Sequence, residues 1–455
     1  MKTIPHEKGL PLLGFLPEFR KDIFAMDKRL VEKHGNICSY NLGPNKIVLL
    51  AQPDYIKHVL QENYLNYKKD YFYDELKLAL GQGLVTSEGD FWRHQRKLIQ
   101  PAFHRNEITQ FAEIMERETK SLAGDWQNNE RSNTIIDLTE DMKKLTMKIV
   151  SQALFGTRIF DNSAKLSESI NYVIDYLNQR LERYLKLPPN IPTPRNLLFR
   201  RHYNNVRDHL LDIISNRREN PGDKKDLLFM LLAAQDEETG LGMSDQQLFD
   251  EIMTLFMAGH ETTAHALVWT WYLLNFHPYV ESQVHDEIEN LGEGINSVFK
   301  NMEALPYTRA VILESMRLIP PVWGIGREAS EDDQINGFLI PAGTTVYIPI
   351  RRMHRHPDHW NDPEKFDPDR FLDGTLEKEK RWVYMPFGGG PRQCIGNHFA
   401  VLEAQIALAV LASLFQVQIN NIENIEFNPG VTLRPKNRVL AKIQVKKVRD
   451  SQNKP

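Results

Sequence analysis

Apolar residues recur at the helical period along most of this 455-residue chain, and β-like patterns are short and few. The β-like stretches are 38–42, 46–51, 344–350 and 439–448. Two segments fit neither pattern: 187–195 is rich in proline and cannot form a helix interior, and 351–387 is long and polar. A long segment without regular structure in a compact domain usually has a function. The pattern predicts a mainly α protein with a small β region, organised as a single large domain over 1–455.

The strongest helical pattern begins at Ser244 and ends at Pro278. Ser244 and Gln247 fit a capping box at its start, and proline cannot continue the helix at its end. A helix of about 30 residues spans about 45 Å, which is enough to cross a domain. Its middle, 258–263, reads Ala-Gly-His-Glu-Thr-Thr, and glycine and threonine are poor helix formers. We therefore expect either a kink or a notch of small residues there.

Two short motifs resemble known binding signatures without satisfying them. A zinc-protease motif needs two histidines four positions apart, on one helix face. His260 and His265 are five positions apart, about 140° around a helix. Gly81 and Gly83 lack the third glycine and the βαβ surroundings of a dinucleotide fingerprint. The first pattern predicts no zinc site, and the second predicts a turn.

Charge and cysteine content exclude several classes of protein. Lys and Arg number 56 against 60 Asp and Glu, a formal net charge of −4, so the chain is not a generally basic nucleic-acid binder. Two cysteines, Cys38 and Cys394, exclude a disulfide scaffold and a four-cysteine metal site. Pro11, Gly14 and Pro17 interrupt the apolar residues near the N-terminus, so neither a signal peptide nor a transmembrane segment is predicted. We expect a cytoplasmic protein.

The second cysteine has the most informative surroundings. Three glycines at 388–390, then Arg392 and Cys394, precede a strongly helical stretch at 399–415. The positive end of that helix favours a thiolate at Cys394 over a thiol. The glycines let the backbone approach a large flat group, and Arg392 offers a charge to an anion. A glycine-rich turn around an inert cysteine is the alternative, and these residues alone leave both open.

This segment resembles the haem-binding loop of the cytochrome P-450 family, Phe-x-x-Gly-x-Arg-x-Cys-x-Gly. It matches every fixed position: Phe387, Gly390, Arg392, Cys394 and Gly396. Four more family motifs occur in the expected order: Trp92 with Arg96, the segment 258–263, Glu314 with Arg317, and Arg370 within 368–371. The resemblance covers nearly the whole chain. It implies the cytochrome P-450 fold, one haem domain without a fused reductase, and a haem b (iron protoporphyrin IX) cofactor.

By this resemblance Cys394 is the axial thiolate ligand of the haem iron, with Phe387 beside it. A thiolate pushes electron density onto the iron and favours O–O cleavage. The haem propionates are expected to meet Trp92, Arg96, Arg327 and Arg392, because arginine suits carboxylates. Glu314, Arg317 and Arg370 resemble a buried ion triad that clamps 351–387 and so fixes the cysteine loop. Cys38 has no such context and is expected to be incidental.

Glu261 and Thr262 resemble the acid–alcohol pair of the family. A threonine hydroxyl can hold oxygen and a water, while a nearby carboxylate supplies protons through water. Gly259 is expected to leave room where the helix crosses the iron, and Thr263 is the fallback hydroxyl. Without a haem, these residues are equally well explained as a small-residue notch.

The resemblance also places a substrate pocket, with apolar and aromatic walls that suit oxidation of C–H bonds. Its expected residues are Tyr71, Phe72, Tyr73, Leu84, Val85, Phe256, Trp323, Ile325, Val431 and Leu433. Trp323 is expected to narrow the pocket above the haem, and 187–195 to form a lid. A lipid and a small methoxylated compound, such as a methylated sugar, both remain open as substrates. Hydroxylation and oxidative O-demethylation remain open as outcomes.

The implied activity is that of a monooxygenase that inserts one atom of O2 into a small organic substrate. Electrons are expected from a separate ferredoxin or flavodoxin with a NAD(P)H reductase, docking on a basic surface around Arg93, Lys97, Arg105 and Arg392. We expect a monomer that binds no nucleic acid. A peroxide-driven peroxygenase or isomerase of the same fold, and a non-catalytic haem-binding sensor or carrier, are the alternatives. The Glu261–Thr262 pair favours the monooxygenase, since peroxide bypasses proton delivery.

Overall fold

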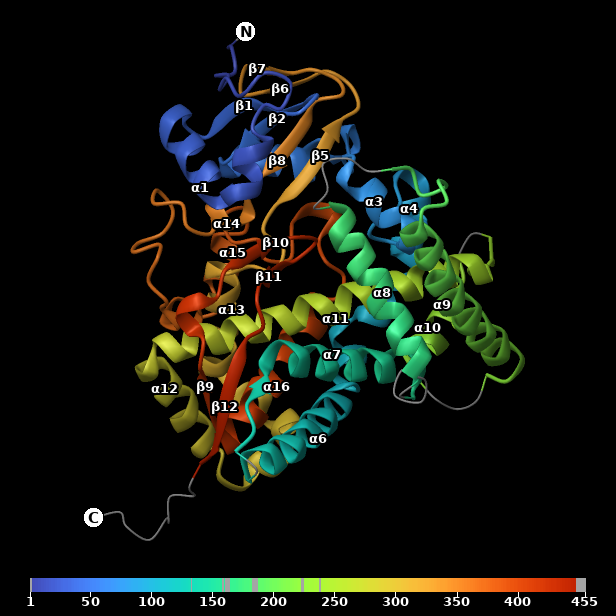
Figure 1. Cartoon of the computed structure of the whole chain (residues 1–455), viewed down its shortest axis with the longest axis vertical. Coiled ribbons are helices and arrows are strands. Elements are labelled where there is room, and N and C mark those ends of the chain that lie inside the picture. Colours follow the sequence, from blue (N-terminus) through green and yellow to red (C-terminus); the bar gives the residue numbers. More distant parts are fainter. Residues whose placement is uncertain are drawn as a thin grey trace.

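The computed structural model describes residues 2–131, 133–157, 159, 164–181, 187–221, 225–236 and 239–446. Helices dominate this part of the chain, as the apolar period predicted (Figure 1). The α-helices are α1 (Leu16–His34), α2 (Pro53–Lys57), α3 (Phe72–Leu80), α4 (Gly89–Ile99), α5 (Arg105–Thr109), α6 (Ala112–Arg131), α7 (Leu138–Phe155), α8 (Ala164–Leu181), α9 (Pro194–Glu219), α10 (Leu227–Ala233), α11 (Asp245–Phe276), α12 (Pro278–Glu289), α13 (Pro306–Leu318), α14 (Ile350–Met353), α15 (Leu376–Glu379) and α16 (Asn397–Leu414).

Helix α11 crosses the middle of the molecule and packs against α7, α13 and α16 (Figure 1). The predicted capping box is confirmed: Ser244 accepts from the Gln247 N–H, and the Gln247 side chain accepts from the Ser244 N–H. The helix runs unbroken through 258–263. Of the two expectations for this segment, a notch of small residues is therefore confirmed and a kink is not. A Cβ on Gly259 would lie 3.3 Å from Cγ2 of Val150 on α7. The glycine therefore allows α7 to pack closely against α11 here, and its expected role beside a haem stays a prediction.

A five-stranded sheet lies at one end of the molecule beside α1 (Figure 1). Its strand order is β1 (Ile37–Leu42), β2 (Asn45–Leu50), β8 (Thr345–Ile348), β5 (Ile325–Ala329) and β3 (Tyr67–Lys68). Strands β2 and β8 are parallel, and the other neighbours are antiparallel. Smaller sheets join β4 (Ile136–Asp137), β12 (Leu440–Val445) and β9 (Phe415–Ile419), then β6 (Asp333–Ile335) with β7 (Phe338–Ile340), and β10 (Phe427–Pro429) with β11 (Leu433–Pro435).

The four β-like stretches correspond to β1, β2, β8 and β12, although 447–448 lie outside the described residues. Strands β5 and β9 and the strands of two or three residues were not predicted. The shortest of these carry no period. The polar segment 351–387 holds only short helices, including the 3₁₀ turn η5 (Pro368–Phe371). The proline-rich segment connects α8 to α9, and α9 begins inside it at Pro194.

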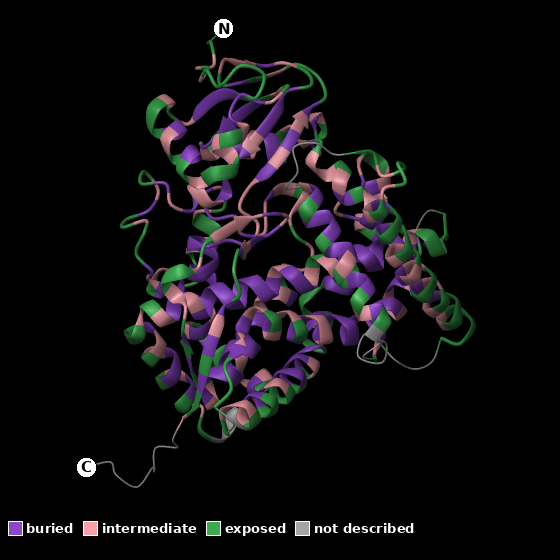
Figure 2. Ribbon diagram, in the orientation of Figure 1, coloured by how far each residue is buried: buried purple, intermediate pink, exposed green. Residues whose placement is uncertain are grey.

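Burial is concentrated on the long central helices (Figure 2). Among the described helices, α16 is the one long and apolar enough to cross a membrane, and 61% of it is buried inside the protein. It packs against α6, α11 and α13, as a core helix does. These contacts fix the helix that begins directly after the cysteine loop.

Candidate active site

The cysteine loop has a conformation that requires glycine. Gly388 and Gly390 both have φ of +70°, in the left-handed region. A Cβ on Gly390 would lie 1.8 Å from the Leu60 carbonyl oxygen, so no other residue fits there. The Cys394 N–H donates to the Phe387 carbonyl at 2.9 Å and closes the loop. The loop thereby presents Cys394 just before α16 begins at Asn397.

The Cys394 side chain is exposed, although protein surrounds the loop. Burial raises the pKa of the thiol, while the Gly396 N–H and the Arg96 guanidinium act in the opposite direction. The N-terminal end of α16 adds a positive potential. These groups suit a thiolate that shares its charge with a metal cation.

The middle of α11 has an open side, although most of the helix is buried. Ala258 is exposed and Thr262 is half-buried, one turn apart on the same face. The Thr262 hydroxyl donates to the Ala258 carbonyl at 2.7 Å. An accessible spot in the middle of a core helix is expected where a large group lies against it.

Cationic side chains from separate elements gather near the cysteine loop. Arg96 on α4 donates from Nη1 to the Gln393 carbonyl at 2.9 Å. The Arg392 guanidinium stacks 4.5 Å from the ring centroid of Trp92 and pairs with Glu88. The structure therefore brings together two motifs, Trp92 with Arg96 and the cysteine loop, that are about 300 residues apart in sequence.

Two further cations belong to this group, and one was not predicted. Arg327 on β5 is buried, and its charge adds to the burial that lowers the pKa of Arg392. Lys69 donates from Nζ to the Ser87 carbonyl at 2.7 Å. Burial, together with the charges of Arg392 and Arg327, lowers the pKa of Lys69 to about 6. Its charged form is therefore favoured only when an anion, such as a haem propionate, lies beside it. The sequence did not predict that Lys69 lies at this site, because Lys69 is outside every motif and only the fold brings it close to the arginines.

We name Lys69, Arg96, Arg327 and Arg392 the cation cluster, and its chemistry fits a haem. In the described part of the chain, Glu88 is the carboxylate paired with it, so positive charge remains in excess. Arg392 Nε is buried without a hydrogen-bond partner among the residues that the structure describes. Two propionates would supply the missing acceptors and charges. The exposed thiol of Cys394 would meet the iron.

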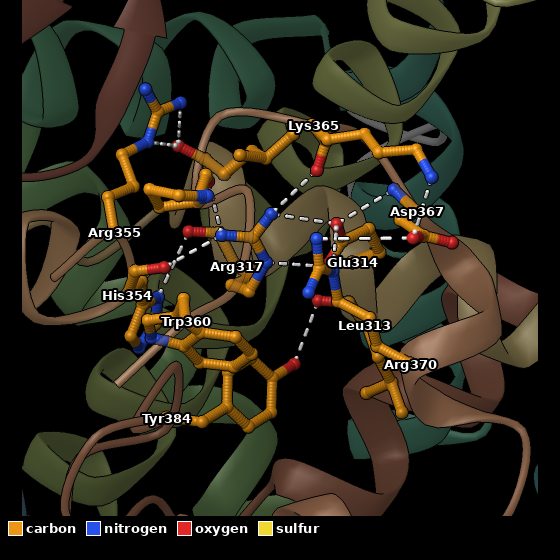
Figure 3. A network of polar contacts seen from close by, with 12 residues as sticks. Leu313, Glu314, Arg317, His354, Arg355, Trp360, Lys365, Asp367, Arg370 and Tyr384 are labelled. Atoms are coloured by element: carbon orange, nitrogen blue, oxygen red, sulfur yellow. Dashed lines mark hydrogen bonds and ion pairs between the residues drawn. The ribbon is translucent and has the colours of Figure 1, made fainter. Parts of the chain in front are cut away.

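The predicted ion triad is present on α13 and in the polar segment (Figure 3). Arg317 donates from Nε to Glu314 Oε2 at 2.6 Å and from Nη2 to Glu314 Oε1 at 2.8 Å. Arg370 Nε lies 3.6 Å from Glu314 Oε1, and the Asp367 N–H donates to the same oxygen at 2.9 Å. Glu314 and Arg317 are fully buried, and burial raises the pKa of the Glu314 carboxyl.

Arg317 also fastens the polar segment directly. Its Nη atoms donate to the carbonyls of His354, Pro363 and Lys365 at 2.7–2.9 Å (Figure 3). The guanidinium lies 4.9 Å from the ring centroid of Trp360. One side chain thus satisfies three backbone acceptors in a segment that has little regular structure of its own.

Glu261 and Thr262 are adjacent in sequence, but their side chains meet different neighbours. Asn178 on α8 donates to Glu261 Oε1 at 3.4 Å. Burial raises the pKa of Glu261, and the charge of Arg434 opposes this. Thr262 is on the open face described above, so the two side chains have separate surroundings.

A cavity of about 110 Å³ brings together five of the predicted pocket residues. These are Tyr71, Phe72, Tyr73, Trp323 and Val431. The ring of Trp323 packs edge-on against Phe19, Phe24 and Tyr347, and its indole N–H donates to the Gly430 carbonyl at 3.1 Å. It forms a wall between α1 and the C-terminal turn. Its expected place above the haem stays a prediction.

The other predicted pocket residues are elsewhere. Ile325 contacts the cysteine loop near Gly388, and Leu84 and Val85 lie in the turn before α4. Phe256 is 1% exposed and stacks on His260, and Leu433 is 0% exposed with its carbonyl bonded to Trp269. The expectation that Phe256 and Leu433 line an open pocket is wrong, because both are packed into the core.

Two other expectations concern isolated residues. Arg392 does not belong to a basic docking surface, since its side chain is 11% exposed and turns inward to Glu88 and Trp92. Cys38 is buried on β1, and burial raises the pKa of its thiol to about 12, in agreement with an incidental role.

Comparison with known proteins agrees with this geometry. The family model described as Cytochrome P450 matches residues 4–441. Cyclooctat-9-en-7-ol 5-monooxygenase of Streptomyces melanosporofaciens is 33% identical, over 85% of this chain and 83% of its own. Cyclooctatin synthase of the same organism is 33% identical over 94% and 91%, and pentalenene oxygenase of Streptomyces avermitilis is 30% identical over 85% of both chains.

The fold also matches that of a solved structure. The crystal structure of a cytochrome P450DA heme domain superposes with a TM-score of 0.89 over 98% of both chains, at 23% identity. The expected fold, cofactor and enzyme class are thereby confirmed. The chain belongs to the cytochrome P450 family and is a monooxygenase with a haem b cofactor.

Proposed function

We propose that this enzyme hydroxylates a C–H bond of a cyclic terpenoid, with electrons from separate redox proteins. The observation that carries the reaction is the exposed thiol of Cys394 together with the open face of α11 at Ala258 and Thr262. The terpenoid class is supported by the relatives, whose names include cyclooctat-9-en-7-ol 5-monooxygenase and pentalenene oxygenase. The aromatic rings at residues 71–73 suit contact with an apolar ring system.

The bound haem supplies the activation of O2, and this chain supplies the environment. Cys394 would hold the iron through its sulfur, with Phe387 beside it. The cation cluster and Trp92 would hold the propionates. Arg317, Glu314 and Arg370 would keep the polar segment in place, so that the cysteine loop stays fixed.

Proton delivery falls to two residues of α11. The Thr262 hydroxyl, which donates to the Ala258 carbonyl, would accept a hydrogen bond from an ordered water on the open face. The Glu261 carboxyl would release protons toward that water, since burial raises its pKa. Val431 and Tyr73 would help to exclude bulk solvent from the substrate side.

The redox partners, the oligomeric state and the location of the enzyme are part of the same proposal. We propose a ferredoxin or flavodoxin with its NAD(P)H reductase as electron source, and a monomeric enzyme in the cytoplasm. Arg93, Lys97 and Arg105 remain candidates for the docking surface, while Arg392 does not. The whole chain, 1–455, would act as a single domain.

A turnover experiment separates this function from its alternatives. The purified haem protein is titrated with cyclic terpenes, followed by the Soret shift that accompanies loss of the iron's water ligand. Binders are then incubated with NADPH, a surrogate ferredoxin system and ¹⁸O2. Incorporation of one labelled oxygen atom supports the proposal. Turnover with peroxide alone would indicate a peroxygenase, and binding without turnover would indicate a sensor or carrier.

A further inference from the structure

One face of α11 meets the C-terminal hairpin, which consists of the antiparallel strands β10 and β11 and the turn between them (Figure 1). The Trp269 indole N–H donates to the Leu433 carbonyl at 2.8 Å. One turn earlier on the helix, His265 Nδ1 lies 3.0 Å from the Thr432 hydroxyl oxygen. Residues four positions apart lie on the same helix face, and the next position in this series is Glu261. The hairpin is therefore held against the face of α11 that carries this acid.

Arg434 lies on the hairpin, close to Asn178 of α8. Successive residues of a strand point to opposite faces, and Arg434 is half-buried whereas Leu433 is in the core. A Cβ on Gly430, in the turn, would lie 3.3 Å from Asn178 Oδ1 and 3.9 Å from Arg434 Nε. The arginine side chain and the asparagine amide thus approach the same glycine.

Asn178 connects this turn to Glu261. Its Nδ2 donates to Glu261 Oε1 at 3.4 Å, while its Oδ1 is the atom that approaches Gly430. Both side chains are buried, with Asn178 1% exposed and Glu261 7% exposed. The amide therefore fixes the Glu261 carboxyl relative to the hairpin.

Charged side chains from three other elements act on Glu261: Arg434 on β11, Lys143 on α7 and Asp175 on α8. Burial raises the pKa of the Glu261 carboxyl, and the Asp175 charge acts in the same direction. The Arg434 charge opposes burial more strongly than the Lys143 charge or the Asn178 hydrogen bond does. Of these neighbours, Arg434 therefore does most to favour the carboxylate.

The other titratable groups on these elements leave that order unchanged. His260 and His265, on α11 itself, stay neutral near pH 7, because burial lowers the pKa of both. Lys143 has a carboxylate partner on its own helix, Glu140, at 3.7 Å. An opposite charge near a buried acid favours the ionised form. The charge of Arg434 therefore affects how readily the buried acid gives up its proton.

We propose that Arg434 is a positioning residue for proton transfer: its guanidinium stabilises the carboxylate that Glu261 becomes when it releases a proton, and Asn178 holds that carboxyl in place. This rests on the proposed function, in which Glu261 supplies protons. In the step itself the O–H bond of Glu261 breaks, and the proton passes to a water on the side of Thr262. A proton from solvent then restores the acid. Without the Arg434 charge, Glu261 keeps its proton more tightly.

Infrared titration of the haem-loaded protein tests this without a substrate. The carboxylic-acid C=O band of Glu261 is identified by its absence in Glu261→Gln and is followed against pH. Arg434→Met should raise the midpoint by about one pH unit, a 10-fold fall in the acid dissociation constant, and Arg434→Lys should restore it. Lys436→Met is the control, because Lys436 directly follows β11 but pairs with Glu426 at 2.6 Å. A wild-type midpoint in Arg434→Met overturns the proposal. Should Arg434→Met fail to load haem, Arg434→Gln against Arg434→Lys gives the same test.

Turnover gives a second measurement and separates this inference from the proposed function. Arg434→Met should lower kcat about 3-fold at unchanged KM and increase the solvent isotope effect, since a weaker acid transfers its proton more slowly. A shifted midpoint with unchanged kcat and isotope effect overturns the proposal. If the midpoint shifts but no terpenoid is oxidised by any variant or by wild type, the action of Arg434 on Glu261 stands and the proposed function fails. If a terpenoid is hydroxylated but Arg434→Met keeps the wild-type midpoint and isotope effect, the function stands and this inference fails.

Discussion

Replacing Glu314 by alanine tests the energetic role of the ion triad most directly. The change removes two hydrogen bonds to Arg317, of 2.6 and 2.8 Å, and the acceptor of the Asp367 N–H. Arg317 remains fully buried with its charge uncompensated, since Arg370 is also a cation. Arg317 keeps its hydrogen bonds to the carbonyls of the polar segment, but its positive charge then has no carboxylate partner in the core.

The size of the effect follows from this burial. Breaking a buried ion pair by removing one partner costs about 3–5 kcal/mol. A domain is typically stable by about 5–15 kcal/mol, so the variant loses a large share of its stability. The loss falls first on 351–387, which contains only short helices and turns and directly precedes the cysteine loop. Haem loading is therefore expected to fall together with the free energy of unfolding.

The assay compares Glu314→Ala with Glu377→Ala. Glu377 pairs with Arg309, also on α13, at 2.9 Å, but both side chains are about one-third exposed. An exposed pair contributes about 0–1 kcal/mol, so this control should stay close to wild type. Urea unfolding gives the free energies, and the Soret band with the reduced-CO spectrum gives haem occupancy. Normal haem occupancy and less than about 1 kcal/mol of destabilisation in Glu314→Ala would refute the reasoning.

Three other predictions concern single residues. Thr262→Ala should lower product formed per NADPH and raise peroxide release, measured by peroxide assay, while Thr263→Ala, whose hydroxyl is buried, should stay coupled. Lys69→Met should release haem to apomyoglobin about 10-fold faster, because a charge-assisted contact is lost, whereas Lys68→Met should behave as wild type. Burial raises the pKa of Glu251 to about 8, from 4.5, so the folded protein keeps a proton that the unfolded chain releases. Wild-type unfolding free energy should therefore fall as pH rises from 6 to 8, and less so in Glu251→Gln; parallel pH profiles would contradict this.

The helical architecture could be predicted because its signals are local. The capping residues Ser244 and Gln247 and the stop at Pro278 fix α11 within one residue at its start, since caps and prolines act on neighbouring backbone groups. The family motifs also located Cys394, Arg96 and the ion triad, because the spacing of residues within each motif reflects a fixed local backbone geometry. Strands of two or three residues, and the pairing of β2 with β8, depend on contacts between distant segments and left no pattern.

What the sequence did not predict are contacts that exist only after folding. Lys69 joins the cation cluster through the close approach of the segments before α3 and before α4. The Gly81 and Gly83 turn, which fits no dinucleotide motif, docks on α11: the Gln82 N–H donates to Asp250 and the Leu84 N–H to Glu251, both near 2.9 Å. A Cβ on Gly83 would lie 2.0 Å from Thr254 Oγ1, so the glycine serves close packing. The roles of the individual site residues, and the single-domain organisation, stay predictions.

Glu261 and Thr262 illustrate how sequence adjacency and functional proximity differ. Neighbouring helical residues point about 100° apart, and here one side chain meets Asn178 while the other lies on the open face. Removing the hydroxyl acts at the site where oxygen and water are held, so it should divert electrons to peroxide. Removing the acid acts one step earlier, so Glu261→Gln should slow turnover with coupling retained and should increase the solvent isotope effect on the rate. If Glu261→Gln releases as much peroxide per NADPH as Thr262→Ala, the two groups act at the same place, and the water-mediated link inferred from their separate neighbours is wrong.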